Sequence, residues 1–551
     1  VNLALGGGVA VSTSLVGVSA EGSVSVADVH SGTLATMNNV NLTADSKNVE
    51  VLARTDGDIV SSADAFNAVW GSTAEVGAGA TVSVLNSDVD TKANVNGGSW
   101  SIKSAQIDAR GINSLYDIAM GFNAGGSTVA AVNAQGNIAV NTLCNDVEAL
   151  VHNANITASG DVSVEADSDE TLHNYAGLLA GAGSATASVG LGATVVVNTI
   201  NGNTVAEIQN GALQADDVDV YAHNMRRVNS SQTGIGVAAS AEGAGTVVGS
   251  VSVHDLEGTT KALVHNVNGS VHSLDVKAER DNDIDSYNNG FALSGAIGSA
   301  SVGAGVTVLN DKSATLATLS SSKLTASGSK DATNKVQVTA DNNTDVHTEV
   351  STNALAVSLG AALGVTVEVV NLDAQTSTNV IGSELGTASR GFAGFDATAT
   401  NVVASSFENA ETAISTAVGI GVGVGVLNIN TQTTTVVDNA KAYADNINIA
   451  ADETRNVQTA LAGVNAGAGN VGVNLMYTNI GGQLQDVYSY DYGDGKTQKE
   501  YCTTKTDDSG LALSASVQGL ANDALATTKA DVHKLESNGL VASGSSGNAI
   551  L

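Results

Sequence analysis

Asp161-Val162-Ser163-Val164-Glu165-Ala166 and, 56 residues later, Asp217-Val218-Asp219-Val220-Tyr221-Ala222 are the stretches that decide the fold of this chain. Each alternates polar and apolar residues, which is the period-two pattern of a β-strand with one buried side. The pattern recurs along the chain, and it is followed most easily by its last residue. The final alanines are Ala53, Ala109, Ala166, Ala222 and Ala278, with later copies expected at Ala340, Ala404 and Ala450.

Two further columns of residues repeat with the same period of 55 to 57 residues as far as Asn310, and the polar column continues less evenly beyond it. A polar residue ends a strand rich in glycine, alanine and valine, and a large apolar residue lies between these strands. The polar column is His30, Asn86, Asn141, Asn198, His254, Asn310, Asn371, Asn428 and Asn474. The apolar column is Phe66, Phe122, Leu179, Ile235 and Phe291. Three columns that share one period indicate an array of eight to nine repeats.

An all-β, right-handed parallel β-helix accounts for these repeats, because stacked copies bury a continuous core that one copy cannot bury alone. We expect the apolar column to form an interior ladder, and each 56-residue unit to make two or three coils. Small residues such as those of 179–183 would let opposing sheets approach closely, so we expect a flat, thin and elongated rod. Helix is expected nowhere except, as a candidate, in 520–535.

Composition favours this fold over other β architectures. The chain of 551 residues has no proline, 61 glycines and only 3% aromatic residues. Proline cannot donate to a ladder, so its exclusion is typical of a backbone committed to sheets. Strings of β-sandwiches or propeller blades would carry more aromatic core residues.

Charge and cysteine usage limit the partners. A net charge of −33 disfavours binding to nucleic acid or anionic lipid. Cys144 and Cys502 are far apart in repeat position, so no shared disulfide is expected. No apolar stretch is long enough for a transmembrane helix, and no signal peptide is visible, so we expect a portion of a longer protein.

The repeat register is lost near Gly482. We expect a repetitive solenoid over 1–481, a tyrosine- and charge-rich insertion or loop over 482–510, and divergent C-terminal coils over 511–551. The insertion contains Tyr488, Tyr490, Tyr492 and Tyr501. Exposed tyrosines among charges suit recognition of protein or glycan, so this segment is either a binding loop or a plain surface insertion.

Gly190-Leu191-Gly192-Ala193-Thr194-Val195-Val196-Val197-Asn198-Thr199-Ile200, followed by 203–208 and the strand 217–220, resembles the repeats of leukotoxin-type filamentous adhesins. These are very large bacterial surface proteins, related in architecture to filamentous haemagglutinins. The resemblance covers about 1–480 and rests on repeat texture. It implies an extracellular location at the outer membrane and a stalk or adhesive role toward a surface protein or glycan of a host or neighbouring cell. The secretion signals and anchor of that family find no match here.

Acidic residues recur just after the alternating motif, and we expect them at turns. Stacked carboxylates either are solvated or bind calcium through oxygen ligands, so the candidate calcium ligands are Asp167, Asp169, Asp281, Asp283 and Asp285. At the corresponding position one copy carries Arg226 and Arg227. Clusters of acids on a β-helix also occur in polysaccharide-cleaving enzymes. The pairs Asp281/Asp283 and Asp216/Asp217 could form a similar cluster.

We therefore expect a non-catalytic, structural or adhesive segment of a giant bacterial surface fibre, without a cofactor. Two alternatives stay open. The chain could self-assemble end to end into an extracellular filament or matrix, because a terminal coil is a free strand edge. Less favoured is a polysaccharide-cleaving enzyme, because similar acids recur in several units whereas an active site is a unique departure from a repeat.

Overall fold

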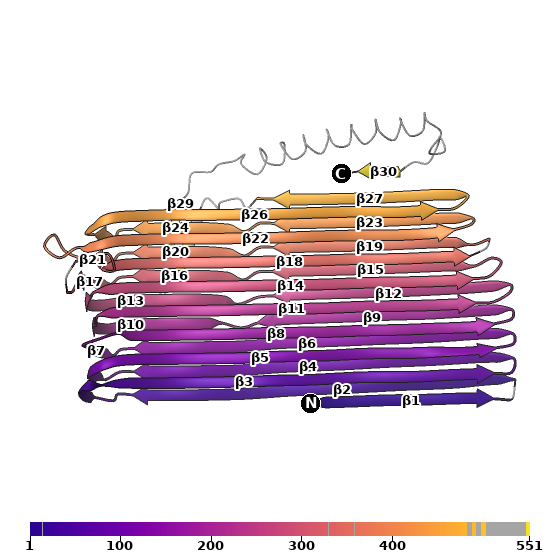
Figure 1. Ribbon diagram of the computed structural model, residues 1–551, viewed down its shortest axis with the longest axis horizontal. Helices are drawn as coiled ribbons and strands as arrows, with labels where there is room; N and C mark the ends of the chain where they lie inside the picture. Colours follow the sequence, from indigo (N-terminus) through magenta and orange to yellow (C-terminus); the bar gives the residue numbers. More distant parts are fainter. Residues whose placement is uncertain are drawn as a thin grey trace.

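The computed structural model describes residues 1–13, 15–328, 330–357, 359–481, 487–491, 498–502 and 547–550, and these residues form a parallel β-helix (Figure 1). The predicted all-β solenoid is confirmed. Long strands run across the molecule and successive rungs stack from the N-terminal end upward. The described residues contain no helix, and the helix candidate 520–535 lies outside them.

Each repeat makes a single rung. β3 (Leu42–Gly71) crosses the molecule, the chain turns, and β4 (Ala74–Asn96) returns. β5 (Ser99–Ser127) then pairs in parallel with β3, placing Phe122 beside Phe66. The expectation of two or three coils per unit is therefore wrong. The period could not show this, because β4 has 23 residues and extends about 75 Å, far beyond the usual strand of five or six residues.

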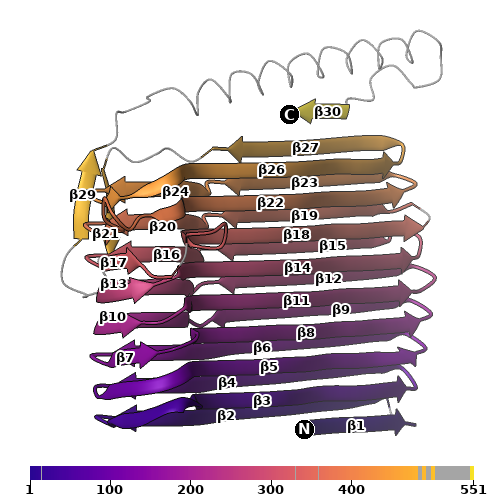
Figure 2. The ribbon, with the colours of Figure 1, turned by 60° about the vertical axis from the view of Figure 1, so that its left-hand side comes forward.

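Two broad faces and a short third side make up the rungs (Figure 2). Among the described residues, nine long strands pair in series on each broad face. The first face contains β1 (Asn2–Ser12), β3, β5, β8 (Val162–Ser184), β11 (Asp217–Ala239), β14 (Ser273–Gly295), β18 (Lys335–Val357), β22 (Phe392–Ser415) and β26 (Ala444–Ala466). The second face contains β2 (Val16–Asn38), β4, β6 (Ala130–His152), β9 (Ala187–Asn201), β12 (Gly243–Leu256), β15 (Ala300–Asp311), β19 (Ala361–Leu372), β23 (Val418–Ile429) and β27 (Gly469–Ile480).

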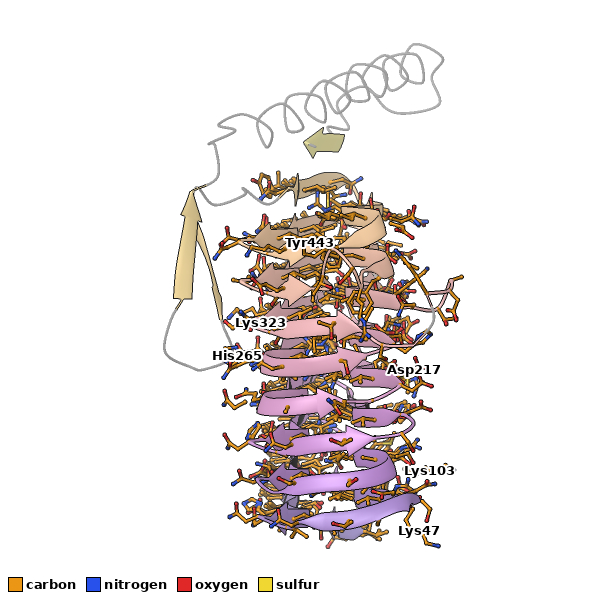
Figure 3. All side chains as sticks on the ribbon, turned by 90° about the vertical axis from the view of Figure 1, so that its left-hand side faces the viewer. Lys47, Lys103, Asp217, His265, Lys323 and Tyr443 are labelled. Atoms are coloured by element: carbon orange, nitrogen blue, oxygen red, sulfur yellow. The ribbon has the colours of Figure 1, made fainter. Side chains whose placement is uncertain are left out.

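The third side closes one end of each rung, here called the wide end. Shorter strands continue the second face there or form the third side itself. They are β7 (Asn155–Ala158), β10 (Thr204–Gln214), β13 (Thr259–Val271), β16 (Ala314–Ser320), β17 (Lys323–Ala326), β20 (Gln375–Ile381), β21 (Glu384–Leu385), β24 (Gln432–Asp438) and β25 (Lys441–Ala442). Figure 3 looks onto this end, where the labelled His265 and Lys323 come from neighbouring rungs.

A left-handed residue turns the chain from the second face onto the third side. Asparagine and glycine tolerate this conformation best, and they dominate the corner. Its members, with φ between 49° and 72°, are Asn39, Gly97, Asn153, Asn210, Asn266, Ser321, Gly382 and Asn439. Asn266 Nδ2 donates to Asn210 Oδ1 at 2.9 Å, so the corner is itself a ladder between rungs.

The wide end contains the main apolar core. Val218, Val220 and Ala222 of the alternating motif point inward, where they pack against side chains of the other two sides, including Ile208. The alanine column is confirmed from Ala53 to Ala340. Its last two members are wrong: the partners of Ala340 are Ala399 and then Ala451, because irregular segments near the third side change the length of those rungs.

At the opposite, thin end the alternation is inverted. Thr81 and Ser83 of β4 are fully buried between the faces, whereas Val82 and Val84 point outward. Little room exists inside, since a Cβ on Gly190 would lie 3.2 Å from the carbonyl oxygen of Ala180 on the opposing sheet. The expected close approach of the sheets is confirmed here. Small and polar residues fill this interior, and the valines are left outside.

The polar column divides into two ladders. Asn141, Asn198 and His254 pair inside the solenoid, with Asn141 Nδ2 donating to Asn198 Oδ1 at 2.9 Å. Outside, Asn371 Nδ2 donates to Asn310 Oδ1 at 2.8 Å. Asn86 belongs to the outer register together with Asp28, and Asn141 lies opposite Leu85 instead. Two expected members fit neither ladder: His30 pairs with Asp88, and Asn428 pairs with Asn479 in place of Asn474. One-residue slips therefore move members of the column between the inside and the outside.

Beyond β27 the structure describes three short strands. β28 (Val487–Asp491) and β29 (Gln498–Cys502) pair antiparallel as a separate hairpin. β30 (Gly547–Ile550) pairs in parallel with Gly472–Leu475 of β27. Most of the expected insertion 482–510 and of the coils 511–551 lies outside the described residues.

Candidate functional surfaces

The five candidate calcium ligands lie on the outer surface of the first face, not at turns. Asp167 and Asp169 are inside β8, and Asp281, Asp283 and Asp285 are inside β14. The strands simply continue past the alternating motif, so the expected turn is wrong. The two groups of acids are separated by the intervening strand β11.

Cations on neighbouring strands stand between these acids. Arg110, Asp167, His223 and Glu279 are register partners in that order. Asp167 accepts a hydrogen bond from His223 Nδ1 at 2.9 Å and lies 3.4 Å from Arg110 Nε. The hydrogen bond lowers the pKa of Asp167 and raises that of His223. We call these outward charged residues, together with Arg227 and Asp281 beside them, the charged ladder.

The same pattern includes the other acids. His223 Nε2 lies 3.5 Å from Asp281, and Arg227 Nη1 lies 3.6 Å from Asp169. Asp283 lies between Arg227 and Asp345 in the register. Among the residues that the structure describes, no three acids, histidines or cysteines are grouped as metal ligands. Asp167, Asp169 and Asp281 therefore lie beside cations of neighbouring rungs, whereas Asp283 stacks on Asp345.

Another pair of acids, which was not among the candidate sites, also stacks directly. Asp219 and Asp275 are register partners on the outer surface. Burial, followed by the charge of Asp275, raises the pKa of Asp219 to about 6. Lys277 donates to Glu279 at 2.7 Å beside them. The sequence could have predicted this pair, since both acids occupy the same variable position of the alternating motif.

The remaining acid pair of interest, Asp216 and Asp217, lies where the third side meets β11. Asp217 accepts a hydrogen bond from Ser273 Oγ at 2.6 Å, and the Asp216 carbonyl accepts one from the His272 backbone at 2.8 Å. These contacts link consecutive rungs. The carboxylate of Asp217 has a role in stacking, whereas Asp216 takes part through its main chain.

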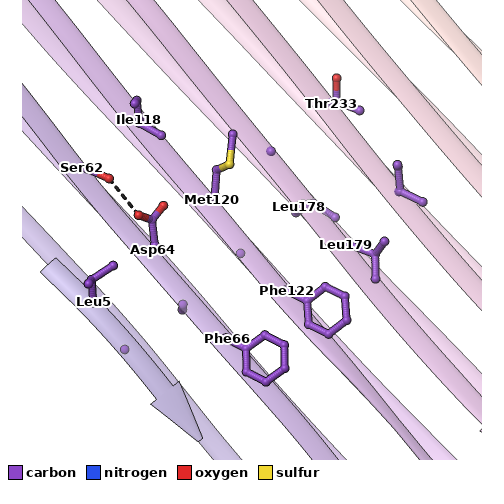
Figure 4. Close-up of a pocket in the computed structure, with 15 residues that line it drawn as sticks. Leu5, Ser62, Asp64, Phe66, Ile118, Met120, Phe122, Leu178, Leu179 and Thr233 are labelled. Carbon is purple, nitrogen blue, oxygen red and sulfur yellow. Dashed lines mark hydrogen bonds between the residues drawn. The ribbon is translucent and has the colours of Figure 1, made fainter. Parts of the chain in front are cut away.

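The predicted apolar column exists, but it is on the outside. Phe66, Phe122, Leu179, Ile235 and Phe291 pair in register on the outer surface of the first face. The rings of Phe66 and Phe122 stack with centroids 5.0 Å apart, and Phe66 is 47% exposed. The prediction that this column forms an interior ladder is therefore wrong, because its residues occupy the alternate positions of their strands whose side chains point outward. Figure 4 shows Phe66, Phe122 and Leu179 of the column beside a shallow apolar groove, which is lined also by Leu5, Ile118, Met120 and Leu178.

The outer surface of the second face is also apolar at the thin end. We call this the valine face. Its two most regular columns contain an aliphatic residue in every rung except the last, where one column ends in tyrosine. They are Val24, Val82, Ile138, Val195, Val251, Val306, Val367, Val424 and Leu475, and beside them Val26, Val84, Val140, Val197, Val253, Val308, Val369, Val426 and Tyr477.

The arginine pair that replaced the acids is divided between inside and outside. Arg226 is fully buried and donates from Nε to Glu170 at 2.6 Å, and its Nη1 donates to the Glu257 carbonyl at 2.6 Å. Arg227 is in the charged ladder outside. Four buried carboxyl groups have raised pKa values because of burial: Asp117 about 6, Glu75 about 7, Glu411 about 7 and Glu368 about 9.

Three of the four candidate tyrosines belong to the β28–β29 hairpin. Tyr488 and Tyr501 are register partners, and Tyr490 pairs with Lys499. Tyr492 lies outside the described residues. The backbone thus brings two of the tyrosines together across the hairpin. Cys144 is a free cysteine on the outer side of β6, and burial raises the pKa of its thiol to about 12.

Comparison with protein-family models, with curated proteins and with solved structures finds no match. In the part of the chain that the structure describes, no helix has the length and apolar character needed to cross a membrane.

Proposed function

We propose that this chain is a structural length of an extracellular bacterial surface fibre, acting as a stalk or adhesion surface rather than as an enzyme. The observation that carries the proposal is the one-rung repeat. Each rung of about 56 residues pairs in register with the next, so added repeats lengthen the stack without changing its cross-section. Such an architecture suits a spacer that projects from a surface.

Contacts between rungs support a mechanical role as a stalk under tension. Besides the backbone ladders, polar side chains join one rung to the next inside and outside the stack, as Asn428 joins Asn371 at 2.7 Å. Separating two rungs breaks all of these contacts together with the ladder. A stalk under tension benefits from this arrangement because force is shared across a strand pair of 23 residues, as in β11 and β14.

Adhesion has its own support in the apolar strip on the first face. Phe66, Phe122 and Leu179 are partly exposed beside a groove of about 690 Å³. Partly exposed aromatic side chains in a shallow groove suit contact with a protein or a glycan ring.

Immunolabelling of intact producing cells tests the proposal. We expect antibody raised against the 551-residue chain to label unpermeabilised cells, and external protease to remove the label. Labelling that needs permeabilisation would contradict a surface fibre. Turnover of an acidic polysaccharide that is lost in Asp281→Asn would instead establish the enzyme alternative.

A further inference from the structure

Among the described residues, the valine face presents an extended aliphatic surface that is only partly buried. Val195 and Val251 are only half-buried, whereas their strand neighbours Thr194 and Ser250 are buried between the sheets. Aliphatic side chains gain about 25 cal/mol per Å² when they leave water. A contiguous apolar patch of this kind marks an interaction surface.

The size of the patch suits a stable protein interface. From Val76 to Val84 the outward columns extend about 26 Å along the strand, and nine rungs extend about 40 Å along the stack, which gives about 1,000 Å². A standard stable interface buries about 800 Å² on each partner. The valine face can therefore supply one side of such an interface without contributions from elsewhere.

The relief of the face is self-complementary. A column of small residues, among them Gly136, Ala193 and Gly249, runs beside the column of Val195 and Val251. Cβ atoms added at Gly136 or Gly249 would meet no atom within 4 Å, so this column is an open groove. The ridge repeats in every rung, and the groove repeats through six rungs, from Gly22 to Ala304, before Val365, Val422 and Val473 fill it in the last three. A second sheet with the same rung spacing is the surface that matches this repeat, as in the dry interface between paired sheets.

Charge favours a second copy over a lipid surface. The valine face ends at the outer polar column, which contains Asp28 and Asp255, and no lysine or arginine interrupts its described outward columns. Membrane-binding surfaces use basic or aromatic anchors at their borders, and this border is acidic and amide-rich. Two copies in contact through this face leave the acids of both chains at the rim.

We propose that two copies of this chain pack face to face through their valine faces, with the valine ridge of each copy seated in the Gly/Ala groove of the other. The inference is independent of the extracellular location proposed above, because it depends only on which side chains of the second-face strands point outward.

Sedimentation equilibrium of the full chain under reducing conditions, up to about 100 µM, tests the proposal. We expect the wild-type mass to be twice the single-chain 54.8 kDa. The variant Val195→Lys/Val251→Lys is expected to show the single-chain mass. The control Thr233→Lys/Ile235→Lys, which adds the same charges to the outer surface of the first face, keeps the double mass.

Circular dichroism must show unchanged β content in each variant. If the lysine variant does not fold, Val195→Thr/Val251→Thr keeps shape and β-branching and is expected to weaken association at least tenfold. A single-chain mass for the wild type overturns the proposal, as does equal dissociation of the control or an unchanged mass for both valine variants. Flotation of single chains with phosphatidylcholine vesicles also overturns it, because the occupant is then a membrane.

Discussion

Arg226 Nε lies 2.6 Å from Oε2 of Glu170 on the preceding rung, and both side chains are fully buried. The buried ion pair fixes the register of two strands whose backbones alone would pair equally well after a slip. A slip of β11 by one residue would move Arg226 to the outside, bring Arg227 inside and leave Glu170 buried without its partner.

Arg226→Met should lower the free energy of unfolding by about 3–5 kcal/mol, because Glu170 would keep a buried charge without its partner. The double variant Glu170→Gln/Arg226→Met should recover much of the loss. Arg227→Met on the outer surface is the matched control and should cost less than about 1 kcal/mol. Urea unfolding followed by circular dichroism measures all three. Equal losses for Arg226→Met and Arg227→Met would show that the inward assignment is wrong.

Glu368 should make the protein less stable as pH rises. Burial raises its pKa to about 9 in the folded chain, against an ordinary value of 4.5. Its stabilising contribution is therefore complete below pH 4.5 and is lost as pH rises toward 9, by about 1.4 kcal/mol per pH unit. Glu368→Gln should reduce the slope of unfolding free energy between pH 5 and 9 by this amount. Glu242→Gln, at an exposed acid between β11 and β12, is the control, and an equal reduction there would refute the assignment.

The pKa of His223 should be raised by Asp167. The hydrogen bond at 2.9 Å favours the imidazolium, so this contribution to stability is present below the ordinary pKa of 6.5 and is lost as pH rises through the higher folded value. Asp167→Asn should lower the pKa of His223, as followed by NMR of labelled histidines. Asp283→Asn on the same surface should leave it within error, and identical shifts in both variants would argue against a direct bond.

Much of the fold could be predicted from the sequence because register partners preserve their chemistry. Ala166, Ala222 and Ala278 are in one column, and their spacing is the rung itself. Alternation, however, says only that a strand has two sides. Whether Val82 or Ser83 is inside depends on the distance between the sheets, and that distance follows from packing across the whole rung.

The surfaces were predictable only in part for the same reason. Asp167 and Asp281 were recognised as recurring acids, but their neighbours in space, His223 and Arg110, are one rung away in the sequence. The outward position of Phe122 was missed because a large apolar column is more often buried. Once the rung length is known, register alone identifies these partners.

Glycines distinguish the inside from the outside of the thin end. Gly190→Val should destabilise the chain by about 1–3 kcal/mol, since its Cβ would lie 3.0 Å from the Val237 carbonyl oxygen and 3.2 Å from that of Ala180. Gly249→Val places the same side chain in open space and should be neutral or stabilising. Thermal unfolding at low protein concentration compares the two. The reverse order would mean that the valines, not the serines and threonines, are inside.

The claim that one repeat is one rung can be tested by disulfide trapping between Thr339 and Thr398, whose Oγ1 atoms lie 3.3 Å apart on adjacent strands. In a Cys144→Ser/Cys502→Ser background, Thr339→Cys/Thr398→Cys should oxidise to an intramolecular disulfide, seen by mass spectrometry of the peptides. Thr339→Cys/Ala450→Cys, two rungs apart and so separated by about 10 Å, should not. Failure of the first pair, or equal oxidation of both, would contradict the single-rung repeat.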